Sequence, residues 1–575
     1  MVLVTTAIDD YSELGDSILL LGEWCKSNSV SSKYQKKIDK TLEYHWVDRK
    51  KFAKDQNTII KLYENLLPKY SKSLNLIHKV NYSENFWRIL IGPWLLFFIS
   101  TLFDRWCSML QATNQDLDFI ALSIVNKEKM TSINMEDFYN KSLEDEWNNY
   151  IFSRIVKKYT SIEFREFFLI KEASKNDFPR VKPKIKDFFK KTLQKLTSPS
   201  LGNDVVFVDS YMPILFQWKL EKLLRQKKSF FQFNFNLRPK FRELDRDKLK
   251  INYSPKNDFE EFIISMIPCQ IPQSYFEHFD SFLNNAKDKK YPQSPKIIFT
   301  SNAHFFNDQF KFWASMNKEL GSKLVIGQHG GGIGSMKVVL SEYMEKSSAD
   351  KYITWGWDDA NFHNIVQLPA QKLLQRKKYS PKNSLLHVMD DNPRYSRLIS
   401  STPISSLHLD YLEDQYLISN QINHNLIKSY FVRRCPNNYK WDTKEAWNKN
   451  VLFDKNKHFL KSINEHKLIL ISSNSTTLLQ VLSANIPTVI FLNPKYNEFR
   501  EESKNDFEVL KKVGIFFDSS ELAAKHINSI WTNVLGWWEN AELQKARNHF
   551  CFKYARTNSN ALLDWKSFIE NLKND

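Results

Sequence analysis

The chain of 575 residues is long enough for two to four domains, and its 42% hydrophobic and 14% aromatic residues suffice for sizeable cores. Its formal net charge of +17 suits an anionic partner, but lysine is spread along the whole sequence, which favours background usage over nucleic-acid binding. The five cysteines are far apart, lack metal-ligand spacing and are odd in number, which argues against a disulfide framework and a cysteine-based metal site.

No secretory signal is visible at the start of the sequence. The short apolar run there has no basic region before it and is followed by acidic residues. Together with the scattered cysteines, which we expect to be reduced thiols, this predicts a cytoplasmic protein. The same run, Leu3–Ile8, and a second one, Ile18–Leu21, are the first predicted strands.

A mainly helical region is predicted over about 34–195, because its apolar residues recur every three to four positions, as in NTIIKLYENLL. Within it, Ile89–Phe103 is the longest apolar run. Its fifteen residues are too few for a comfortable membrane span, and Arg88 and Asp104 close its ends. We expect a buried helix, with a helix lying in a membrane interface as the alternative.

The pattern changes after residue 204, where short β-branched runs alternate with helical segments. DVVFVDS and KIIFTSN are predicted strands, and a helical segment separates the second from KLVIGQHGGG. A strand–helix–strand order predicts parallel pairing. Ligands of open α/β sheets bind outside the carboxyl ends of the strands, so the residues that follow these strands are site candidates.

A second series of short strands starts near Lys351 and includes KYITWGW, SLLHVMDD, YFVRRCP and GIFFDSS, and the clearest βαβ unit spans Lys467–Asn493. The sequence therefore predicts an α/β protein with two Rossmann-like domains facing each other. We expect an N-terminal domain over 1–345, with a large helical insertion over about 34–195. A C-terminal domain is expected over 346–535, and helices over 536–575 are expected to pack back onto the N-terminal domain.

Five of the thirteen glycines fall within eight residues, in the stretch KLVIGQHGGGIGS. Glycines after a strand let the backbone approach a ligand closely and direct several N–H groups at an anion. The spacing fits neither the phosphate loop ending in Gly-Lys-Ser/Thr nor the dinucleotide fingerprint. His329 is predicted to act as an acid or base, with a structural histidine in a tight turn as the alternative. The residues expected to contact the anion are Gln328, Gly330, Gly331 and Gly332.

The segment SSNSTT, Ser472–Thr477, holds five hydroxyl-bearing residues between a predicted strand and a predicted helix. Hydroxyls at a helix N-terminus cap free N–H groups, and the same end attracts phosphate. One cap would suffice for structure, so we predict that this segment binds an anion. After the next strand, Glu498 could accept a ribose hydroxyl and Arg500 could pair with a phosphate, although a solvated loop explains both equally well. The expected contacts in the hydroxyl-rich segment are Ser472, Ser473, Asn474, Ser475 and Thr476.

Acidic or imidazole side chains follow several predicted strands of the N-terminal half, namely Asp9, Asp10, Glu23, Asp209 and His304. A carboxylate in such a place can serve as base or nucleophile, although each alone is more often a cap or turn residue. Asp209, in VVFVDSY, has the best context, and His304 would face the same crevice. The catalytic candidates are thus His329, Asp209, Glu23 and His304.

Several motifs are missing from the sequence: His-Glu-x-x-His, Cys-x-x-Cys, the nucleophile elbow and the aromatic signatures of RNA binding. Asp-x-Asp occurs at 116–118 and 245–247, but neither copy follows a convincing strand. We therefore expect no metal, no cofactor and no nucleic-acid partner.

Stretches distributed over nearly the whole chain match a known sequence family: LGEWC, NFWRILIGPWL, VDSYMP, GQHGGGIG, TWGW, NSTTLLQVLSANIPTVIF and FCFKYAR. Through these stretches the chain resembles a family of transferases from O-antigen and surface-polysaccharide gene clusters. The two-domain layout is similar to that of GT-B glycosyltransferases, which implies that the N-terminal domain is on the acceptor side and that the C-terminal domain binds the nucleotide-sugar donor. The anion and ribose contacts predicted above would then be contacts with this donor. The Gln-His-Gly loop is similar to one in capsule-assembly transferases that use nucleotide-activated 2-keto sugar acids.

The resemblance implies a glycosyltransferase that moves a sugar, with a CMP-linked 2-keto sugar acid as one expectation, from a nucleotide donor to a surface-polysaccharide or lipid-linked glycan. The alternatives are polyol-phosphate transfer from a CDP donor and a non-catalytic assembly protein with a relic nucleotide site. We expect a cytoplasmic location with at most peripheral contact with the inner face of the inner membrane, where lysine and arginine would meet anionic headgroups.

Overall fold

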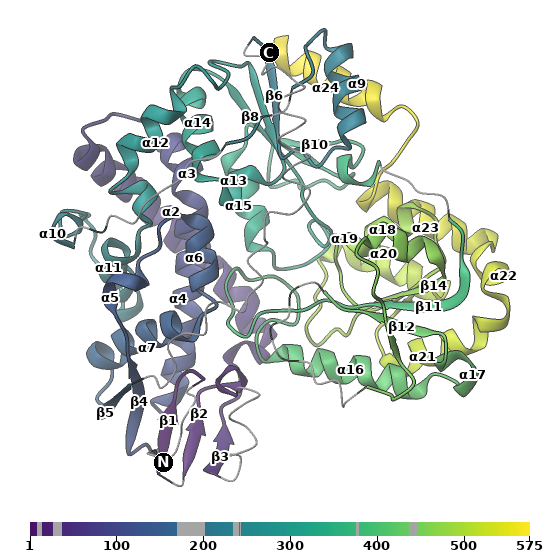
Figure 1. Cartoon of the computed structure of the whole chain (residues 1–575), viewed down its shortest axis with the longest axis horizontal. Helices are drawn as coiled ribbons and strands as arrows, with labels where there is room; N and C mark the ends of the chain where they lie inside the picture. Colours follow the sequence, from purple (N-terminus) through teal and green to yellow (C-terminus); the bar gives the residue numbers. More distant parts are fainter. Residues whose placement is uncertain are drawn as a thin grey trace. The chain divides into compact units, whose positions relative to one another are not determined.

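The computed structural model describes residues 1–7, 14–15, 17–26, 37–168, 202–229, 231–233, 241, 243–374, 379–435, 437, 439, 441 and 447–574 (Figure 1). Asp9 and Asp10, and the end of the predicted strand Leu3–Ile8, lie outside these residues. Packing divides the chain into two units, each built from separate stretches of sequence. Unit 1 comprises Met1–Val208, Ser229–Leu324 and Pro393–Ile399, and unit 2 comprises Asp209–Lys228, Val325–Asn392 and Ser400–Asp575.

The first sheet of unit 1 has five strands in the order β3-β2-β1-β4-β5, and all neighbours are parallel. This is the doubly wound order, in which the chain starts in the middle of the sheet and winds first to one edge and then to the other. Leu3 in β1 aligns with Leu19 in β2 on one side and with Ile120 in β4 on the other. The strands are β1 (Val2–Val4), β2 (Ile18–Leu20), β3 (Ile38–Thr41), β4 (Phe119–Ile124) and β5 (Phe164–Phe168).

The region 34–195, expected to be a helical insertion, supplies three of these strands, so that expectation is corrected. Most of its described residues are helical, but β3, β4 and β5 belong to the same sheet as β1. In β4 the run FIALS is buried at every position. Such a short run cannot be told from a buried piece of helix by periodicity alone, and pairing with β1 decides the outcome.

The helices of unit 1 pack around its sheets, with α2 against α3 and α4, and α4 against α7. The longest, α2, is capped at its N-terminus by Asp48, whose carboxylate accepts hydrogen bonds from the Lys50 and Lys51 N–H groups at 3.0 Å. The helices are η1 (Glu23–Cys25), η3 (His45–Val47), α2 (Arg49–His78), α3 (Glu84–Leu90), α4 (Gly92–Ala112), α5 (Lys127–Met130), α6 (Met135–Lys141), α7 (Asp145–Tyr159), α10 (Glu243–Arg246), α11 (Asp258–Gln270), η4 (Gln273–Tyr275), α12 (Phe279–Ala286), α13 (Ala303–Phe306) and α14 (Asp308–Glu319).

The apolar run Ile89–Phe103 is buried along its whole length, as predicted, and it is divided between α3 and α4. The chain bends by 61° between the two helices, and Pro93 stands in the first turn of α4, where its missing N–H costs no hydrogen bond. Within the described residues no single helix is both long enough and apolar enough to cross a membrane; α3 and α4 meet that test only as a bent pair.

Two further strands of unit 1, β6 (Val205–Val208) and β7 (Ile297–Thr300), pair in parallel, with Val205 opposite Ile297. The strand β8 (Lys323–Gly327) begins in unit 1, where the Lys323 N–H donates to the Lys296 carbonyl at 2.9 Å, and continues in unit 2. The predicted succession of strand, helix and strand over this stretch is confirmed by β7, α14 and β8.

A segment that follows β11 in the sequence, Pro393–Ile399, belongs to unit 1. Arg105 of α4 donates to the Ser396 carbonyl at 2.6 Å, and Ser100 of α4 donates to the Arg397 carbonyl at 2.6 Å. Arg394 pairs with Asp145 of α7 at 2.7 Å. Buried polar contacts to two helices therefore make this distant segment part of unit 1.

Unit 2 contains two groups of parallel strands. In the first, β8 pairs with β9 (Lys351–Thr354) and β9 with β10 (Ile365–Gln367). The second is a six-stranded parallel sheet in the doubly wound order β13-β12-β11-β14-β15-β16. Its strands are β11 (Lys382–Val388), β12 (Tyr430–Arg433), β13 (Leu452–Phe453), β14 (His466–Ile471), β15 (Thr488–Phe491) and β16 (Phe516–Phe517).

The α/β class with parallel sheets is therefore confirmed. Near the C-terminus, α23 packs on α19 and α20, and α24 packs on α9, whose sequence falls within the range 1–345. The helices of unit 2 are α9 (Ile214–Leu223), α15 (Leu340–Ser348), η5 (Gln371–Leu373), α16 (Leu407–Gln421), α17 (His424–Ile427), α18 (Phe459–Glu465), α19 (Thr476–Ser483), α20 (Glu501–Lys512), α21 (Ser520–Ile530), η7 (Trp531–Asn533), α22 (Val534–Trp538), α23 (Ala541–Tyr554) and α24 (Ala561–Asn574).

Candidate functional site

The glycine-rich stretch forms the loop between β8 and α15 in unit 2, and the buried Gln328 holds its start. The Gln328 Oε1 atom accepts hydrogen bonds from the Trp355 N–H at 3.1 Å and the Trp357 Nε1–H at 2.8 Å. Its Nε2 group donates to the Gly330 carbonyl at 2.7 Å. The structure thus gives the Gln328 side chain partners inside the protein, and its predicted contact with the donor stays a prediction.

The glycines of this loop pack against the segment that precedes α19. A Cβ atom on Gly331 would stand 2.3 Å from the Ser475 carbonyl group, and one on Gly332 would stand 2.6 Å from the Asn474 carbonyl oxygen. The Gly331 N–H donates to Thr476 Oγ1 at 3.0 Å. Gly331 and Gly332 therefore allow close packing of the loop on the start of α19, and their predicted contact with a phosphate stays a prediction.

The hydroxyl-rich segment divides into a buried and a more exposed part. Ser472 is buried, and its Oγ atom lies 2.8 Å from the Tyr411 hydroxyl and 3.2 Å from His387 Nε2. Asn474 is also buried and donates to Ser335 Oγ at 3.0 Å. The half-buried members are Ser473, Ser475, Thr476 and Thr477. Ser475 is the N-cap of α19, but its hydroxyl makes no capping hydrogen bond, so the first N–H groups of α19 are not capped by it.

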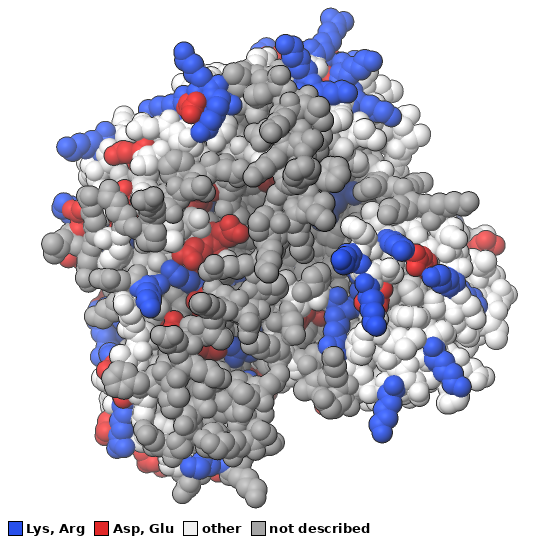
Figure 2. Space-filling model, viewed as in Figure 1, with Lys and Arg blue, Asp and Glu red and all other residues white. Residues whose placement is uncertain are grey.

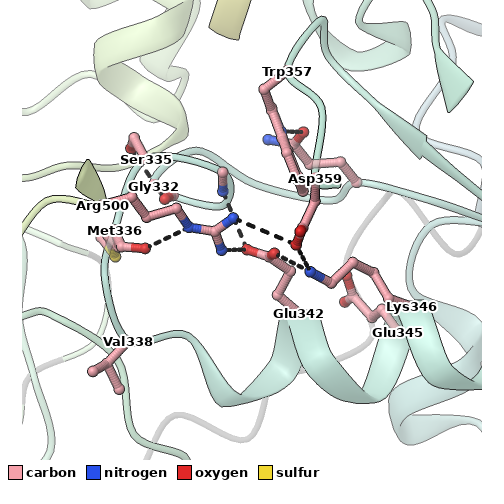
Figure 3. A network of polar contacts seen from close by, with 12 residues as sticks. Gly332, Ser335, Met336, Val338, Glu342, Glu345, Lys346, Trp357, Asp359 and Arg500 are labelled. Carbon is pink, nitrogen blue, oxygen red and sulfur yellow. Dashed lines mark hydrogen bonds and ion pairs between the residues drawn. The ribbon is translucent and has the colours of Figure 1, made fainter. Parts of the chain in front are cut away.

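Arg500 belongs to a network of ion pairs that fastens the far end of the glycine loop (Figure 3). Its guanidinium pairs with the buried Glu342 of α15 and donates to the Met336 carbonyl at 2.9 Å. Lys346 pairs with Glu342 at 2.8 Å and also with Asp359, and the Arg500 Nη1 atom lies 3.9 Å from Asp359. The predicted phosphate contact of Arg500 therefore competes with two carboxylates that already hold this side chain.

Glu498 contributes its backbone to the same region, because its carbonyl accepts a hydrogen bond from the Lys337 N–H at 2.9 Å. Met336 and Phe499 form an isolated antiparallel bridge. These contacts join the glycine loop to the segment that follows β15. The Glu498 side chain is half-buried, and its predicted contact with a ribose stays a prediction.

His329 is the residue of the loop for which an acid or base role is predicted. Its Nδ1 atom lies 2.8 Å from the Glu345 carboxylate, and its side chain is 28% exposed whereas that of Glu345 is fully buried. The Tyr352 hydroxyl donates to the other oxygen of Glu345 at 2.9 Å. The buried carboxylate beside Nδ1 fixes the orientation of the ring, and an imidazole oriented in this way can act as an acid or base through its Nε2 atom.

Asp209, the other candidate in unit 2, lies near this pair of side chains. It is exposed and has a left-handed backbone conformation, with φ of 44°. Burial raises the pKa of Tyr211 to about 12, and the charges of Asp209 and Glu345 add to that effect. Lys372 lies 4.6 Å from the centre of the Tyr211 ring and donates to the His329 carbonyl at 3.2 Å. The structure thus gathers Asp209, His329 and two residues that the sequence did not single out, Tyr211 and Lys372.

The remaining catalytic candidates belong to unit 1. Glu23 lies in η1, where its carboxylate pairs with Lys26 at 2.6 Å. His304 lies in α13 and is buried, with its ring centre 4.9 Å from that of Phe305. A catalytic role for His304 would require its ring to become exposed. The structure therefore does not bring these two residues together with His329 within one unit.

One group of side chains in unit 1 has the geometry of a metal site. Among the described residues, His45, Asp55 and Cys107 could hold an ion. The Lys51 ammonium already contacts all three, at 3.4 Å from His45 Nδ1 and 3.7 Å from Cys107 Sγ, and it also binds Asp55. A lysine therefore supplies the positive charge at this place.

The doubly wound sheet of unit 2 has its switch point between β11 and β14, where ligands of such sheets bind. Val388 and Ile471 are opposite each other at the ends of these strands, and Ser472 and Ser473 follow β14. Asp390 follows β11, and burial raises the pKa of its carboxyl group. Sequence reasoning missed Asp390, although the pair of aspartates in SLLHVMDD at a strand end was a visible signal.

Fold and site together define an α/β protein with doubly wound parallel sheets and a histidine–carboxylate pair at the end of a strand. A family model described as LIC12162 family transferase matches residues 1–569, and the chain belongs to this family. The protein is therefore a transferase. No curated protein matches the chain.

Several solved glycosyltransferase structures resemble parts of the chain weakly. Spinosyn rhamnosyltransferase SpnG covers 53% of this chain and 78% of its own, at 9% identity and a TM-score of 0.29. The glycosyltransferase SnogD from Streptomyces nogalater covers 64% of this chain and 99% of its own, at 10% identity and a TM-score of 0.34. A variant of the wall teichoic acid polymerase TagF covers 53% and 77%, at 10% identity and 0.29. At these TM-scores the likenesses carry no argument about this chain.

Proposed function

We propose that the protein is a glycosyltransferase of GT-B type that moves a sugar from a nucleotide donor onto a surface-polysaccharide or lipid-linked glycan. The observation that carries the proposal is the pair formed by His329 and the buried Glu345, 2.8 Å apart, at the end of β8. Glycosyl transfer to a hydroxyl needs a base that takes the proton of the acceptor, and an oriented imidazole is suited to this role. Asp209, exposed and nearby, is the second candidate for a base or nucleophile.

The donor is proposed to bind at the carboxyl ends of β11 and β14. The half-buried hydroxyls of Ser473, Ser475 and Thr476 and the start of α19 stand at this edge. Hydrogen bonds from such groups stabilise the charge that develops on a departing nucleotide phosphate. A CMP-linked 2-keto sugar acid is the donor that we propose to test first. No cofactor or metal is invoked.

We further propose that the protein works in the cytoplasm, at most peripherally attached to the inner face of the inner membrane. Burial of Ile89–Phe103 inside unit 1 supports this proposal, because the run is engaged in the protein's own core. On the face that Figure 2 shows, lysine and arginine side chains are scattered over several parts of the surface. Attraction of such charges to anionic headgroups is screened within about 10 Å at 0.1 M salt, so we expect release by salt washing.

The deciding experiment is a titration of the full chain with CMP, CDP, UDP and GDP, followed by assays of the matching nucleotide sugars. Selective binding of one nucleotide, with release of that nucleotide from its sugar conjugate, is the expected result. Release of CMP from a CDP-polyol would instead assign polyol-phosphate transfer. Absence of binding to all four nucleotides would contradict both enzymes and favour a non-catalytic assembly protein.

Substitution of His329 tests whether nucleotide release depends on this site. His329→Ala is expected to abolish nucleotide release, whereas the control His363→Ala is expected to leave it unchanged because His363 lies in the exposed loop between β9 and β10. Retention of activity by His329→Ala within about threefold, which is less than 1 kcal/mol of barrier, would show that His329 is a structural residue.

A further inference from the structure

A cavity of about 250 Å³ in unit 2 lies beside the His329 loop and has no role in the steps described above. Its volume is below the range of about 300–1,000 Å³ that holds drug-sized ligands, so it suits a smaller molecule. Its apolar wall comes from four elements or their flanks, and its polar groups are few. The apolar lining residues are Met212, Pro213, Leu373, Leu460, Ile463 and Ala484.

One cation, Lys372, lines the cavity, and burial lowers the pKa of its ammonium group. Within the part of the chain that the structure describes, no carboxylate lies within 4.0 Å of its Nζ atom. Its partners are the His329 carbonyl, at 3.2 Å, and the face of the Tyr211 ring. A half-buried ammonium whose partners are a single carbonyl and a ring face is costly unless an anion joins it.

Two more polar groups line the same cavity and have hydrogen-bonding capacity to spare. Neither the Tyr211 hydroxyl nor the Gln480 side-chain amide has a hydrogen-bond partner among the residues that the structure describes. Ser483 and Asn464 also line the cavity, and their side chains donate to backbone carbonyls of their own helices. A cation, a phenol and an amide thus meet one small space with apolar walls.

The loop that brings Tyr211 to the cavity is strained. Tyr211 has φ of 59° and Asp209 has φ of 44°, a left-handed region that side chains other than glycine rarely adopt. Strain of this kind persists where the surrounding structure requires it, which is most often at binding sites. Three independent features therefore meet at this cavity. They are the strained loop, the Lys372 ammonium without a carboxylate partner, and the Tyr211 and Gln480 side chains without hydrogen-bond partners among the described residues.

We propose that this cavity binds a small hydroxylated anion, a sugar acid or a sugar phosphate of monosaccharide size, with Lys372 as its counter-ion. The negative head pairs with the ammonium, the phenol and the amide bind hydroxyl groups, and the apolar wall covers the carbon skeleton. The inference concerns binding and does not depend on the proposed transfer reaction.

The test is a calorimetric titration of the full chain with three probes: glucuronate, glucose 6-phosphate and glucose. At least one of the two anions is expected to bind at least about tenfold more tightly than glucose. A preference for one of them identifies the head group as carboxylate or phosphate. Equal affinity for glucose and both anions, or no saturable binding of either anion, would overturn the proposal.

Variants locate the site. Lys372→Gln is expected to weaken anion binding at least about tenfold. The matched control is Lys461→Gln, because Lys461 lies on the neighbouring α18 with its side chain exposed and paired with Glu465. This control should bind the anions as the natural chain does. Ser483→Phe, which keeps Lys372 and fills the cavity, should also abolish binding and serves if Lys372→Gln does not fold.

Unchanged binding in folded Lys372→Gln and Ser483→Phe would place the anion elsewhere and refute the proposal. A chain that binds glucuronate or glucose 6-phosphate but none of the four nucleotides would retain this inference and lose the proposed function. The two claims therefore fail separately.

Discussion

The carboxylate of Glu345 is expected to position His329. Glu345→Gln keeps the size of the side chain and an oxygen for Tyr352, but it removes the charge beside Nδ1. If His329 takes a proton during transfer, this variant should lower the rate of nucleotide release by about 10²-fold and leave the donor KM nearly unchanged. The measurement is steady-state kinetics over a range of pH, because the pH profile of the rate should change as well.

The control for this variant is Glu501→Gln, since Glu501 is 82% exposed and stands at the start of α20. It should change neither the rate nor the pH profile. A Glu345→Gln enzyme with the natural rate and the natural pH profile would show that the contact with His329 serves the fold alone.

Gly331 and Gly330 are neighbours in the loop that differ in how much room they leave for a side chain. A Cβ atom on Gly331 would overlap the Ser475 carbonyl group at 2.3 Å, whereas one on Gly330 would meet only Thr476 Oγ1, at 3.3 Å. Gly331→Ala should therefore lower the free energy of unfolding by about 1–3 kcal/mol or more, and Gly330→Ala should cost clearly less. Urea unfolding of both variants measures the difference; equal losses would mean that the loop does not pack on α19 as described.

At the scale of elements, a buried polar network links β11, β12, β14 and α16 through His387. His387 Nδ1 lies 2.7 Å from the Tyr430 hydroxyl, and Nε2 lies 3.0 Å from Gln415 Oε1 and 3.2 Å from Ser472 Oγ. Burial lowers the pKa of His387 to about 3, below its ordinary value of 6.5. The neutral ring therefore stabilises the fold fully above pH 6.5, and this contribution is lost as the pH falls from 6.5 toward 3.

We therefore expect the protein to lose stability between pH 6.5 and pH 5, by about 2 kcal/mol from this histidine. His387→Gln should show a smaller loss over the same interval, although it is less stable at pH 7. The measurement is urea unfolding at the two pH values, with His424→Gln, at an exposed position on α17, as the control. An identical pH dependence in His387→Gln and the natural chain would contradict the assignment.

Elements that depend on local pattern were predictable from sequence, and contacts between distant elements were not. The units β7–α14–β8 and β14–α19–β15 follow from short β-branched runs separated by helical periodicity. The packing of Gly331 on Thr476 joins residues 145 positions apart, which no local pattern encodes. Glu345 escaped notice because SEYMEK has the composition of an exposed charged helix, whereas Glu342, Glu345 and Lys346 are all buried in the structure.

At the scale of the whole molecule, the chain does not divide where its composition changes. The predicted boundary between residues 345 and 346 stays a prediction for the division of function, but packing assigns 209–228 and 325–392 to one unit and 393–399 to the other. Neither unit is a continuous stretch of sequence. The physical reason is that strands and helices from separate stretches complete each core, as α9 and α24 do in unit 2.

This organisation predicts that a fragment 1–350, which ends just after the expected boundary and keeps α15 whole, does not fold cooperatively. Unit 1 would lack the segment that receives hydrogen bonds from Arg105 and pairs with Asp145. The part of unit 2 in the fragment would lack β9, which pairs with β8, and the two tryptophans that hold Gln328. Unsatisfied buried groups and a free strand edge should leave the fragment without a sharp urea transition and with weak near-ultraviolet circular dichroism.

The matched control is the same cut with nothing removed: the full chain nicked between Asp350 and Lys351, in the link between α15 and β9. Because both pieces are present, all the contacts of both units can form, and the nicked protein should keep a cooperative transition close to that of the intact chain. A fragment 1–350 that unfolds as sharply as the nicked protein would show that the first 350 residues form an independent domain, and that contacts with the later segments are not needed for either core.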